Sequence, residues 1–334
     1  MIAYEILQTK LKRRPKKWVV TGVAGFIGSH LAETLLKLNQ KVVGLDNYST
    51  GYATNIEDVL GKISPLQRRS FRMIEGDITC TVDCRRACRG ADYVLHQAAL
   101  GSVPRSFEQP IQTHLANTTG FLEILLAAQR AKVGRVVYAS SSSVYGDDKT
   151  LPKKEPHAGA PLSPYAVSKA VDELYAAVFG KGYGQEIVGL RYFNVFGPRQ
   201  DPNGPYAAVI PQWIQALLSG RKTHVNGDGK TSRDFCYVAN AVQANLLAAT
   251  SGQGPGRTYN VAAGARTTLS QLHRQLRKLT GTKDRPQHRE FREGDVRHSL
   301  ADISLAKREL DFRPTHSLEQ GLEQTVSWYR AQAS

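Results

Sequence analysis

The chain has 334 residues, of which 41% are hydrophobic, and this is enough for one large domain or two fused domains with a buried core. No stretch approaches eighteen consecutive apolar residues, so we expect no membrane-spanning helix. The formal net charge of +15 would suit a polyanionic partner, but the basic residues are spread along the chain without interleaved aromatic residues. We therefore expect no nucleic-acid partner and interpret the charge as a dispersed surface that attracts an anionic small molecule.

The N-terminal residues 1–16 form a basic segment that ends in a run of lysines and arginines. They lack the apolar region of a signal peptide, so we read them as a basic arm or short leader helix of a cytoplasmic chain. Further on, Cys80, Cys84 and Cys88 recur every four residues and would line one stripe of a helix. No partner pattern of His or Cys follows them, so we predict apolar helix positions and neither a metal site nor disulfides.

Apolar runs without alternation are separated by amphipathic helical stretches, which predicts a parallel sheet covered on both faces. Strands are expected at residues 18–21, 42–46, 71–75, 93–97, 136–140, 187–193 and 259–261, and helices at 26–39, 82–89, 118–132, 164–181, 269–280 and 318–330. The fold class is thus α/β, a doubly wound parallel sheet of about seven strands with a smaller C-terminal lobe. We assign residues 17–196 plus 234–263 to the sheet domain, and 197–233 plus 264–334 to a substrate-binding lobe.

A glycine-rich turn joins the first predicted strand to the first helix. Gly22 permits the tight turn, Gly25 lets the backbone approach a pyrophosphate, and Gly28 lets the helix pack closely on the strand. Asp46 ends the next strand, eighteen residues after Gly28, where an acid can accept both ribose hydroxyls of NAD and repel the 2′-phosphate of NADP. The alternative for Asp46 is a turn residue before Asn47. The pattern favours a Rossmann domain that binds a dinucleotide.

Tyr165 and Lys169 lie four residues apart, so on a helix they share one face. A nearby ammonium group favours the ionised form of a phenol, as does a cationic nicotinamide ring, so such a tyrosine can act as a general base at neutral pH. An isolated pair at this spacing is more often a surface tyrosine with a helical neighbour. The glycine turn and Asp46 in the same chain favour the catalytic interpretation here.

Ligands of doubly wound sheets bind outside the carboxyl ends of the strands. The predicted strands place six noteworthy residues at such ends: Gly22, Asp46, Asp77, Ala98, Ser141 and Asn194. These features, in this order, resemble the extended short-chain dehydrogenase/reductase family, and within it the bacterial UDP-N-acetylhexosamine 4-epimerases of O-antigen synthesis. The resemblance runs from residue 18 to about 329 and includes the stretches 75–78, 96–100, 190–198 and 232–235.

The resemblance implies that NAD stays tightly bound and is regenerated in each turnover. It assigns these residues to the cofactor: Gly22, Gly25, Phe26, Ile27, Gly28, Asp46, Asn47, Asp77, Ile78, Gln97, Ala98, Ala99, Tyr165, Lys169 and Tyr192.

The resemblance also implies how the reaction proceeds. Tyr165 takes the proton of the sugar 4-hydroxyl, Ser141 hydrogen-bonds that oxygen, and Lys169 binds the nicotinamide ribose. Related 4,6-dehydratases carry Asp-Glu where this chain has Ser142 and Ser143, and a serine cannot do the acid–base work of dehydration. We therefore place Ser142 with the catalytic residues of an epimerase. The alternative for the serine run is that it caps its own backbone.

The implied substrate is a UDP-sugar, which Arg233 and Arg292 would hold by its diphosphate and Asp295 by its uridine ribose. Ser299 stands where a tyrosine would exclude a 2-acetamido group, so UDP-N-acetylglucosamine is the expected substrate. The full set of expected substrate contacts is Gly101, Ser102, Ser143, Asn194, Gln200, Ala208, Val209, Val225, Asn226, Arg233, Arg292, Asp295 and Ser299.

Two alternatives stay open. One is a UDP-uronic acid epimerase or decarboxylase, in which Arg105 or Arg199 would face the carboxylate. The other is a non-catalytic NAD-binding protein with an anionic partner. The resemblance further implies a homodimer with a four-helix contact made by residues 121–131 and 164–181 of each subunit.

Overall fold

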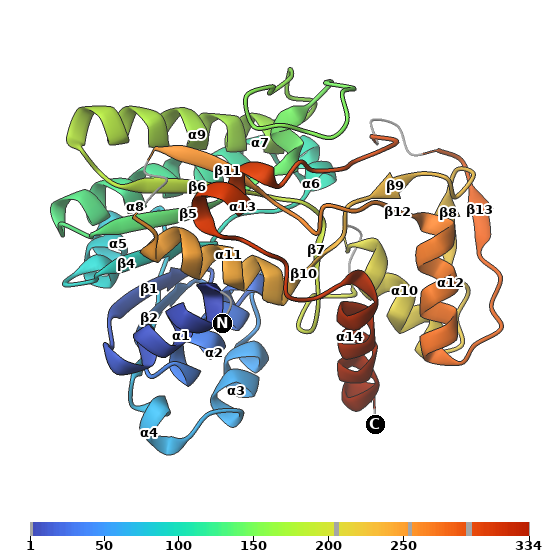
Figure 1. Cartoon of the computed structure of the whole chain (residues 1–334), viewed down its shortest axis with the longest axis horizontal. Helices are drawn as coiled ribbons and strands as arrows, with labels where there is room; N and C mark the ends of the chain where they lie inside the picture. The colour runs from blue at the N-terminus through green and yellow to red at the C-terminus, as the bar shows by residue number, and fades with distance from the viewer. Residues whose placement is uncertain (1–2, 204–206, 253–255, 292–295, 334) are drawn as a thin grey trace.

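The computed structural model describes residues 3–203, 207–252, 256–291 and 296–333. Its main element is a seven-stranded sheet in the order β11-β6-β5-β4-β1-β2-β3, in which all neighbouring strands are parallel (Figure 1). The strands are β1 (Lys17–Thr21), β2 (Lys41–Asp46), β3 (Phe71–Glu75), β4 (Tyr93–His96), β5 (Arg135–Ser141), β6 (Ile187–Tyr192) and β11 (Arg257–Val261). The predicted doubly wound sheet is confirmed, with strand boundaries within two residues of those expected.

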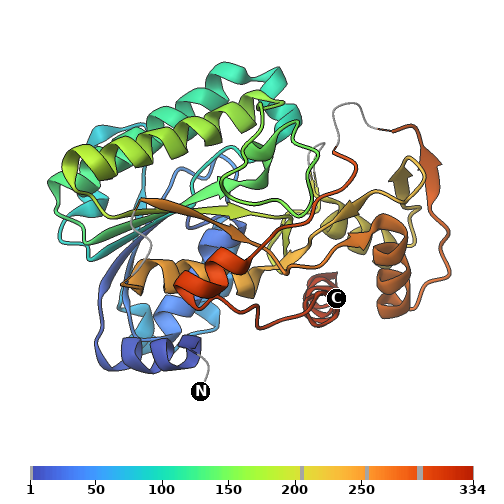
Figure 2. The same cartoon turned by 45° about the horizontal axis from the view of Figure 1, so that its top comes forward.

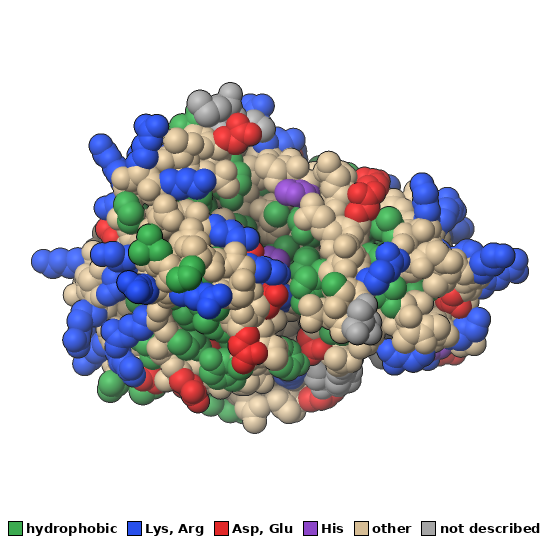
Figure 3. Space-filling view, turned by 90° about the horizontal axis from the view of Figure 1, so that it is seen from below, with side chains coloured by type: hydrophobic (Ala, Val, Ile, Leu, Met, Phe, Trp, Pro, Cys, Tyr) green, Lys and Arg blue, Asp and Glu red, His purple; other side chains and the backbone are tan. Residues whose placement is uncertain are grey.

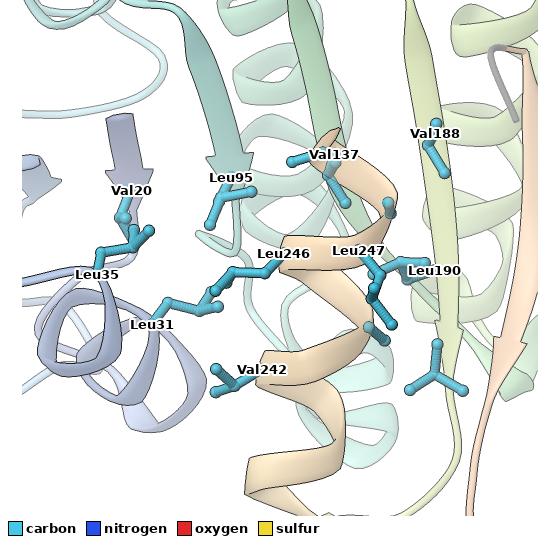
Figure 4. Close-up of a cluster of buried hydrophobic side chains, with 14 of the residues drawn as sticks. Val20, Leu31, Leu35, Leu95, Val137, Val188, Leu190, Val242, Leu246 and Leu247 are labelled. Atoms are coloured by element: carbon cyan, nitrogen blue, oxygen red, sulfur yellow. The ribbon is translucent and has the colours of Figure 1, made fainter. Parts of the chain in front are cut away.

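The sheet is buried on both faces. Helices α2 (Phe26–Lys37) and α11 (Val238–Thr250) cover one face, and α5 (Thr81–Cys88), α8 (Gly120–Arg130) and α9 (Pro164–Tyr183) cover the other (Figures 1 and 2). Because successive strand residues point to opposite faces, neighbours such as Val136 and Val137 belong to different cores. Figure 4 shows Val137 and Val20 in the core beneath α2 and α11. Burial of both faces explains why the strands are apolar without alternation.

The N-terminal segment is a helix packed on the sheet domain. Helix α1 (Ala3–Arg13) buries Leu7 and Leu11 in the same core as α2 and α11, while its basic residues lie toward its last turn. Of the two readings of this segment, an arm or a short leader helix, residues 3–13 form the helix, and its two leucines lie one helical turn apart and dock as a single apolar stripe.

A third buried cluster lies beyond the sheet and contains Trp213, Leu272 and Val326. It is built by α10 (Val209–Leu218), α12 (Leu269–Thr280) and α14 (Leu318–Ala333), beside the parallel pair β8 (His224–Asn226) and β13 (Gln287–Arg289). The expected return of residues 234–263 to the main sheet is confirmed by α11 and β11. The exact division into two domains stays a prediction.

The remaining elements are short. They are α3 (Ala53–Gly61), α4 (Pro65–Arg68), α6 (Val103–Glu108), α7 (Pro110–His114), the π-helix η1 (Leu115–Thr119), the 3-10 helix η2 (Ser142–Tyr145), β7 (Val195–Phe196), β9 (Ser232–Arg233), β10 (Cys236–Tyr237), β12 (Thr267–Thr268) and α13 (Ser304–Leu310).

The cysteine stripe is only partly as expected. Cys84 and Cys88 are buried in α5, and burial raises the pKa of the Cys88 thiol to about 12, but Cys80 is exposed and precedes the helix. Within the described ranges, no group of three or more His, Cys, Asp or Glu side chains could hold a metal ion. None of the described helices has the length and apolar character needed to cross a membrane. On the face seen in Figure 3, Lys and Arg side chains lie at both ends and are also scattered between them, so on this face the positive charge is dispersed.

Candidate functional site

A cavity of about 1540 Å³ opens at the carboxyl ends of the sheet strands and extends toward the smaller lobe. All six residues predicted at strand ends line it, together with Tyr165 and Lys169 from α9. The expected cofactor and catalytic residues all line this one cavity: Gly22, Gly25, Phe26, Ile27, Gly28, Asp46, Asn47, Asp77, Ile78, Gln97, Ala98, Ala99, Ser141, Ser142, Tyr165, Lys169 and Tyr192.

The turn between β1 and α2 has no room for side chains. Gly22 has φ +67°, in the region that favours glycine, and a Cβ there would lie 2.7 Å from the Ala98 nitrogen. A Cβ on Gly28 would lie 2.0 Å from the Gly22 carbonyl oxygen. The bare backbone leads into the N-terminus of α2, which favours a bound anion by its free N–H groups. This cradle fits a dinucleotide pyrophosphate.

Asp46 connects the glycine turn to the end of β2. Its carboxylate accepts hydrogen bonds from the Ala24 N–H (2.9 Å) and the Tyr48 N–H (2.8 Å). Burial raises the pKa of Asp46 above its ordinary value, although these hydrogen bonds oppose the rise. The carboxylate borders the cavity and retains lone pairs for ribose hydroxyls, since each oxygen can accept more than one hydrogen bond. It therefore has a structural role in the turn as well as the position expected of an NAD-selecting acid.

Asp77 lies beside Asp46 at the end of the neighbouring strand. It accepts hydrogen bonds from Asn47 Nδ2 (2.7 Å) and from the Thr79 N–H (2.7 Å). Burial would raise the pKa of Asp77, but the hydrogen bonds from Thr79 and Asn47 outweigh it and hold the pKa below its ordinary value. The carboxylate is thus ionised and fixed in orientation at the cavity edge.

Tyr165 and Lys169 lie on one face of α9, as their spacing predicted. Ser163 caps this helix by accepting a hydrogen bond from the Ala166 N–H (3.1 Å), and Pro164 occupies the first helical position. Among the described residues, none hydrogen-bonds the Tyr165 hydroxyl, which leaves it available to a ligand in the cavity. Lys169 is buried, and its ammonium lies 3.2 Å from the Asp172 carboxylate.

The serine run ends β5 and begins η2. Ser140 is buried and its hydroxyl donates to Glu173 Oε1 (2.5 Å), while Ser141 Oγ accepts from the Ser143 N–H (3.1 Å). The backbone-capping alternative therefore holds in part for Ser141, whose hydroxyl proton stays free to donate. Ser142 and Ser143 line the cavity, and the buried Ser143 Oγ has no hydrogen-bond partner in the described structure.

Two asparagines that the sequence interpretation missed support the site. Asn117, in η1, accepts from the Leu100 N–H (2.7 Å) and donates to Ser168 Oγ (3.0 Å), so it connects the loop after β4 to α9. Asn245, in α11, donates to the Tyr192 hydroxyl (2.6 Å) and accepts from Gln97 Nε2 (3.2 Å). No local pattern marks either residue, because both act through contacts distant in sequence.

The expected substrate contacts fall into three groups. Gly101, Ser102, Ser143, Asn194, Gln200, Ala208, Arg233 and Ser299 line the cavity. Val209, Val225 and Asn226 do not: Val209 begins α10, Val225 is buried in the core of the lobe, and Asn226 is exposed beyond it. Alternation along β8 explains the last two, because it points Val225 inward and Asn226 outward. Arg292 and Asp295 lie outside the described residues.

Arg199 does not fit the role of a carboxylate-binding residue. Its guanidinium is buried, pairs with Glu33 and lies 2.6 Å from Asp58 Oδ2, so it connects α2 to α3 outside the cavity. Arg105 is different, since it lines the cavity from α6. Of the two arginines proposed to face a uronic acid carboxylate, Arg105 is therefore the one that lies at the cavity.

Residues 18–262 match the family model described as the NAD dependent epimerase/dehydratase family. The chain belongs to this family. It is 35% identical to a UDP-glucose 4-epimerase of Mycolicibacterium smegmatis, over 93% of this chain and 98% of that one. Its cofactor is accordingly NAD, which the glycine cradle and Asp46 fit.

Two solved structures of the family are also similar. One is a UDP-N-acetylglucosamine 4-epimerase from Methanobrevibacter ruminantium M1 in complex with UDP-N-acetylmuramic acid (38% identity, TM-score 0.89, covering 95% of this chain and 99% of that one). The other is a UDP-glucuronic acid 4-epimerase from Bacillus cereus in complex with UDP-glucuronic acid and NAD (30% identity, TM-score 0.86, covering 95% and 99%). The relatives thus share a fold and a reaction at C4 but differ in their sugars.

Proposed function

We propose that this protein is an NAD-dependent 4-epimerase that interconverts UDP-N-acetylglucosamine and UDP-N-acetylgalactosamine through a 4-keto intermediate, for bacterial surface polysaccharide such as O-antigen. The observation that carries the proposal is the convergence of Tyr165, Lys169 and Ser141 on the cavity that the glycine cradle and Asp46 also border. This arrangement suits reversible oxidation of an alcohol held between a base and a nicotinamide ring.

NAD and three side chains each have a separate part in the proposed reaction. NAD, when bound, supplies the acceptor that takes the C4 hydride and later returns it. Tyr165 accepts the proton of the 4-hydroxyl and gives it back, Ser141 donates a hydrogen bond to the same oxygen, and Lys169 holds the phenolate and the nicotinamide ribose. Inversion requires the keto sugar to present its opposite face to the nicotinamide ring before the hydride returns. Ser142 and Ser143 supply no carboxylic acid, which disfavours dehydration.

The acetamido preference is inferred from small polar residues on the sugar side of the cavity. Gly101, Ser102 and Ser299 line that region, and the Ser143 hydroxyl is unpaired among the described residues. A buried hydroxyl that hydrogen-bonds the substrate discriminates strongly against analogues that lack the partner group. The identity of 38% with a UDP-N-acetylglucosamine 4-epimerase supports the same choice.

A second candidate is a UDP-uronic acid 4-epimerase or decarboxylase. It is favoured by the position of Arg105 at the cavity and by the similarity to a UDP-glucuronic acid 4-epimerase. A non-catalytic NAD-binding role is the remaining alternative, which the intact Tyr165, Lys169 and Ser141 disfavour.

Purified protein incubated with each UDP-sugar and no added NAD separates these functions. We expect UDP-N-acetylglucosamine to give UDP-N-acetylgalactosamine, and the Tyr165→Phe variant to lose at least about a hundredfold in rate while retaining bound NAD, since a positioned base contributes roughly 10²–10⁴-fold. Conversion of UDP-glucuronic acid alone would select the second candidate. Absence of any conversion by the parent protein would select the non-catalytic role.

A further inference from the structure

Lys169 lines the cavity, but its side chain is almost completely shielded from solvent. Its side chain is 3% exposed, and the Asp172 side chain, 3.2 Å away, is 1% exposed. The two residues are one turn apart on α9, and Asp172 lies two turns from Tyr165, so base, ammonium and carboxylate follow one another down one helix face. A buried lysine needs such compensation, because an unpaired buried charge strongly destabilises the folded state.

Asp172 is itself incompletely satisfied. Its Oδ2 accepts from Lys169, whereas its buried Oδ1 has no hydrogen-bond partner among the described residues. Burial raises the pKa of the Asp172 carboxyl to about 6, and the Lys169 ammonium opposes that rise. Among the described residues, the one ion pair of this carboxylate is with the Lys169 ammonium, which favours its ionised form.

The other ionisable groups around this pair cannot replace Asp172. Glu173 on α9 is occupied by Arg191 of β6, with contacts of 2.9 and 2.7 Å, and by Ser140. Burial raises the pKa of Tyr138 on β5, which keeps its phenol neutral.

His96 on β4 is neutral as well. Burial and then the charge on Lys169 lower the pKa of His96 to about 3. Thr21 Oγ1 already accepts from the Gln97 and Ala98 N–H groups (both 3.2 Å), so its hydroxyl proton is directed to His96 Nδ1 at 2.8 Å. His96 therefore offers no negative charge to Lys169.

We propose that Asp172 is the counter-ion of Lys169, a positioning residue that keeps the ammonium protonated and in place while Tyr165 gives up and takes back its proton. The part played by Tyr165 rests on the proposed function, but the pairing of charges does not. Removal of the carboxylate leaves the lysine as an uncompensated buried cation. Lys169 then releases its proton at a lower pH.

The direct test is an NMR titration of protein labelled with ¹³Cε-lysine in the NAD-bound state, with Lys169→Arg used to assign the signal. In Asp172→Asn, which keeps the shape but not the charge, we expect Lys169 to titrate about one to three pH units lower than in the parent. Asp172→Glu, which keeps the charge, should restore most of that difference. Superimposable titrations of Asp172→Asn and the parent would overturn the proposal.

Activity and stability provide independent measurements. The alkaline limb of the kcat/KM profile for the UDP-sugar should move to lower pH in Asp172→Asn, whereas a merely structural role would lower the rate evenly at all pH values. If Asp172→Asn does not fold, the double variant Lys169→Met/Asp172→Asn decides: the proposal expects the double variant to regain folding, and equal failure of both overturns it. A parent that converts no UDP-sugar refutes the proposed function, while the NMR titration still tests the counter-ion.

Discussion

Gly28→Ala tests the physical basis of the cofactor cradle. An added Cβ would lie 2.0 Å from the Gly22 carbonyl oxygen and 2.7 Å from its carbon, whereas real Cβ atoms essentially never approach closer than 3.0 Å. The turn and α2 must therefore separate by about 1 Å, and overpacking of this kind costs about 1–3 kcal/mol or more. The atoms in contact belong to the backbone, so no side-chain rotation can relieve the clash.

We expect Gly28→Ala to purify with much less NAD than the parent and to unfold at a lower temperature. The measurements are the NAD content per chain after acid extraction and the thermal unfolding midpoint. Gly182→Ala is the matched control, because the Cβ it adds near the end of α9 would meet no described atom within 4 Å apart from its own residue, its chain neighbours and the adjacent backbone of the helix. It should keep its NAD and match or slightly exceed the parent in stability. A full complement of NAD and an unchanged midpoint in Gly28→Ala would refute the packing argument.

Three further predictions follow from the site and from α9. Asp46→Ser should relax the preference for NAD over NADP in a binding titration, because the 2′-phosphate is no longer repelled; an unchanged preference would assign the selecting acid elsewhere. Ser299→Tyr should remove activity on acetamido sugars, because a tyrosine there would exclude the 2-acetamido group; equal kcat/KM values of the parent for UDP-galactose and UDP-N-acetylgalactosamine would contradict this role of Ser299. Leu174→Glu should convert the expected homodimer to monomers in light scattering, because Leu174 is an apolar residue that is 67% exposed on α9, within the expected dimer contact. Leu66→Glu, an exposed position on α4, is its control, and a mass unaffected by Leu174→Glu would exclude α9 from the contact.

The sheet could be predicted from the sequence because its information is local. Most strands of the sheet are short apolar runs buried on both faces, with the edge strand β3 more exposed, and the glycine turn and Asp46 mark where strands end. The edge of the sheet at which the cavity lies could be predicted from the same strand ends, since the carboxyl ends of parallel strands meet at one side of a sheet. Helices that are buried by contacts distant in sequence were harder to predict, and α1 is an example. The sequence alone does not indicate that its two leucines are buried, because their burial depends on α11 packing beside them.

The supporting residues of the site could not be predicted for the same reason. Nothing near Arg199 in the sequence indicates an ion-pair partner. In the fold it pairs with Glu33, 166 residues away in sequence, and with Asp58, 141 residues away. Asn117 resembles any helical asparagine until the loop after β4 closes on it. Asp172 could have been noticed one turn beyond Lys169, but only its burial distinguishes a counter-ion from a solvated charge.

In the proposed reaction, one bound NAD removes and returns the same hydride at C4 of the sugar. It is tested by incubating the protein, without added NAD, with UDP-N-acetylglucosamine deuterated at C4 and a ¹³C-labelled but undeuterated sample of the same sugar nucleotide. We expect UDP-N-acetylgalactosamine that retains deuterium at C4 in the molecules that carried it, with no transfer to the ¹³C-labelled product. Loss of deuterium to solvent, its appearance in the ¹³C-labelled product, or no product at all would contradict it.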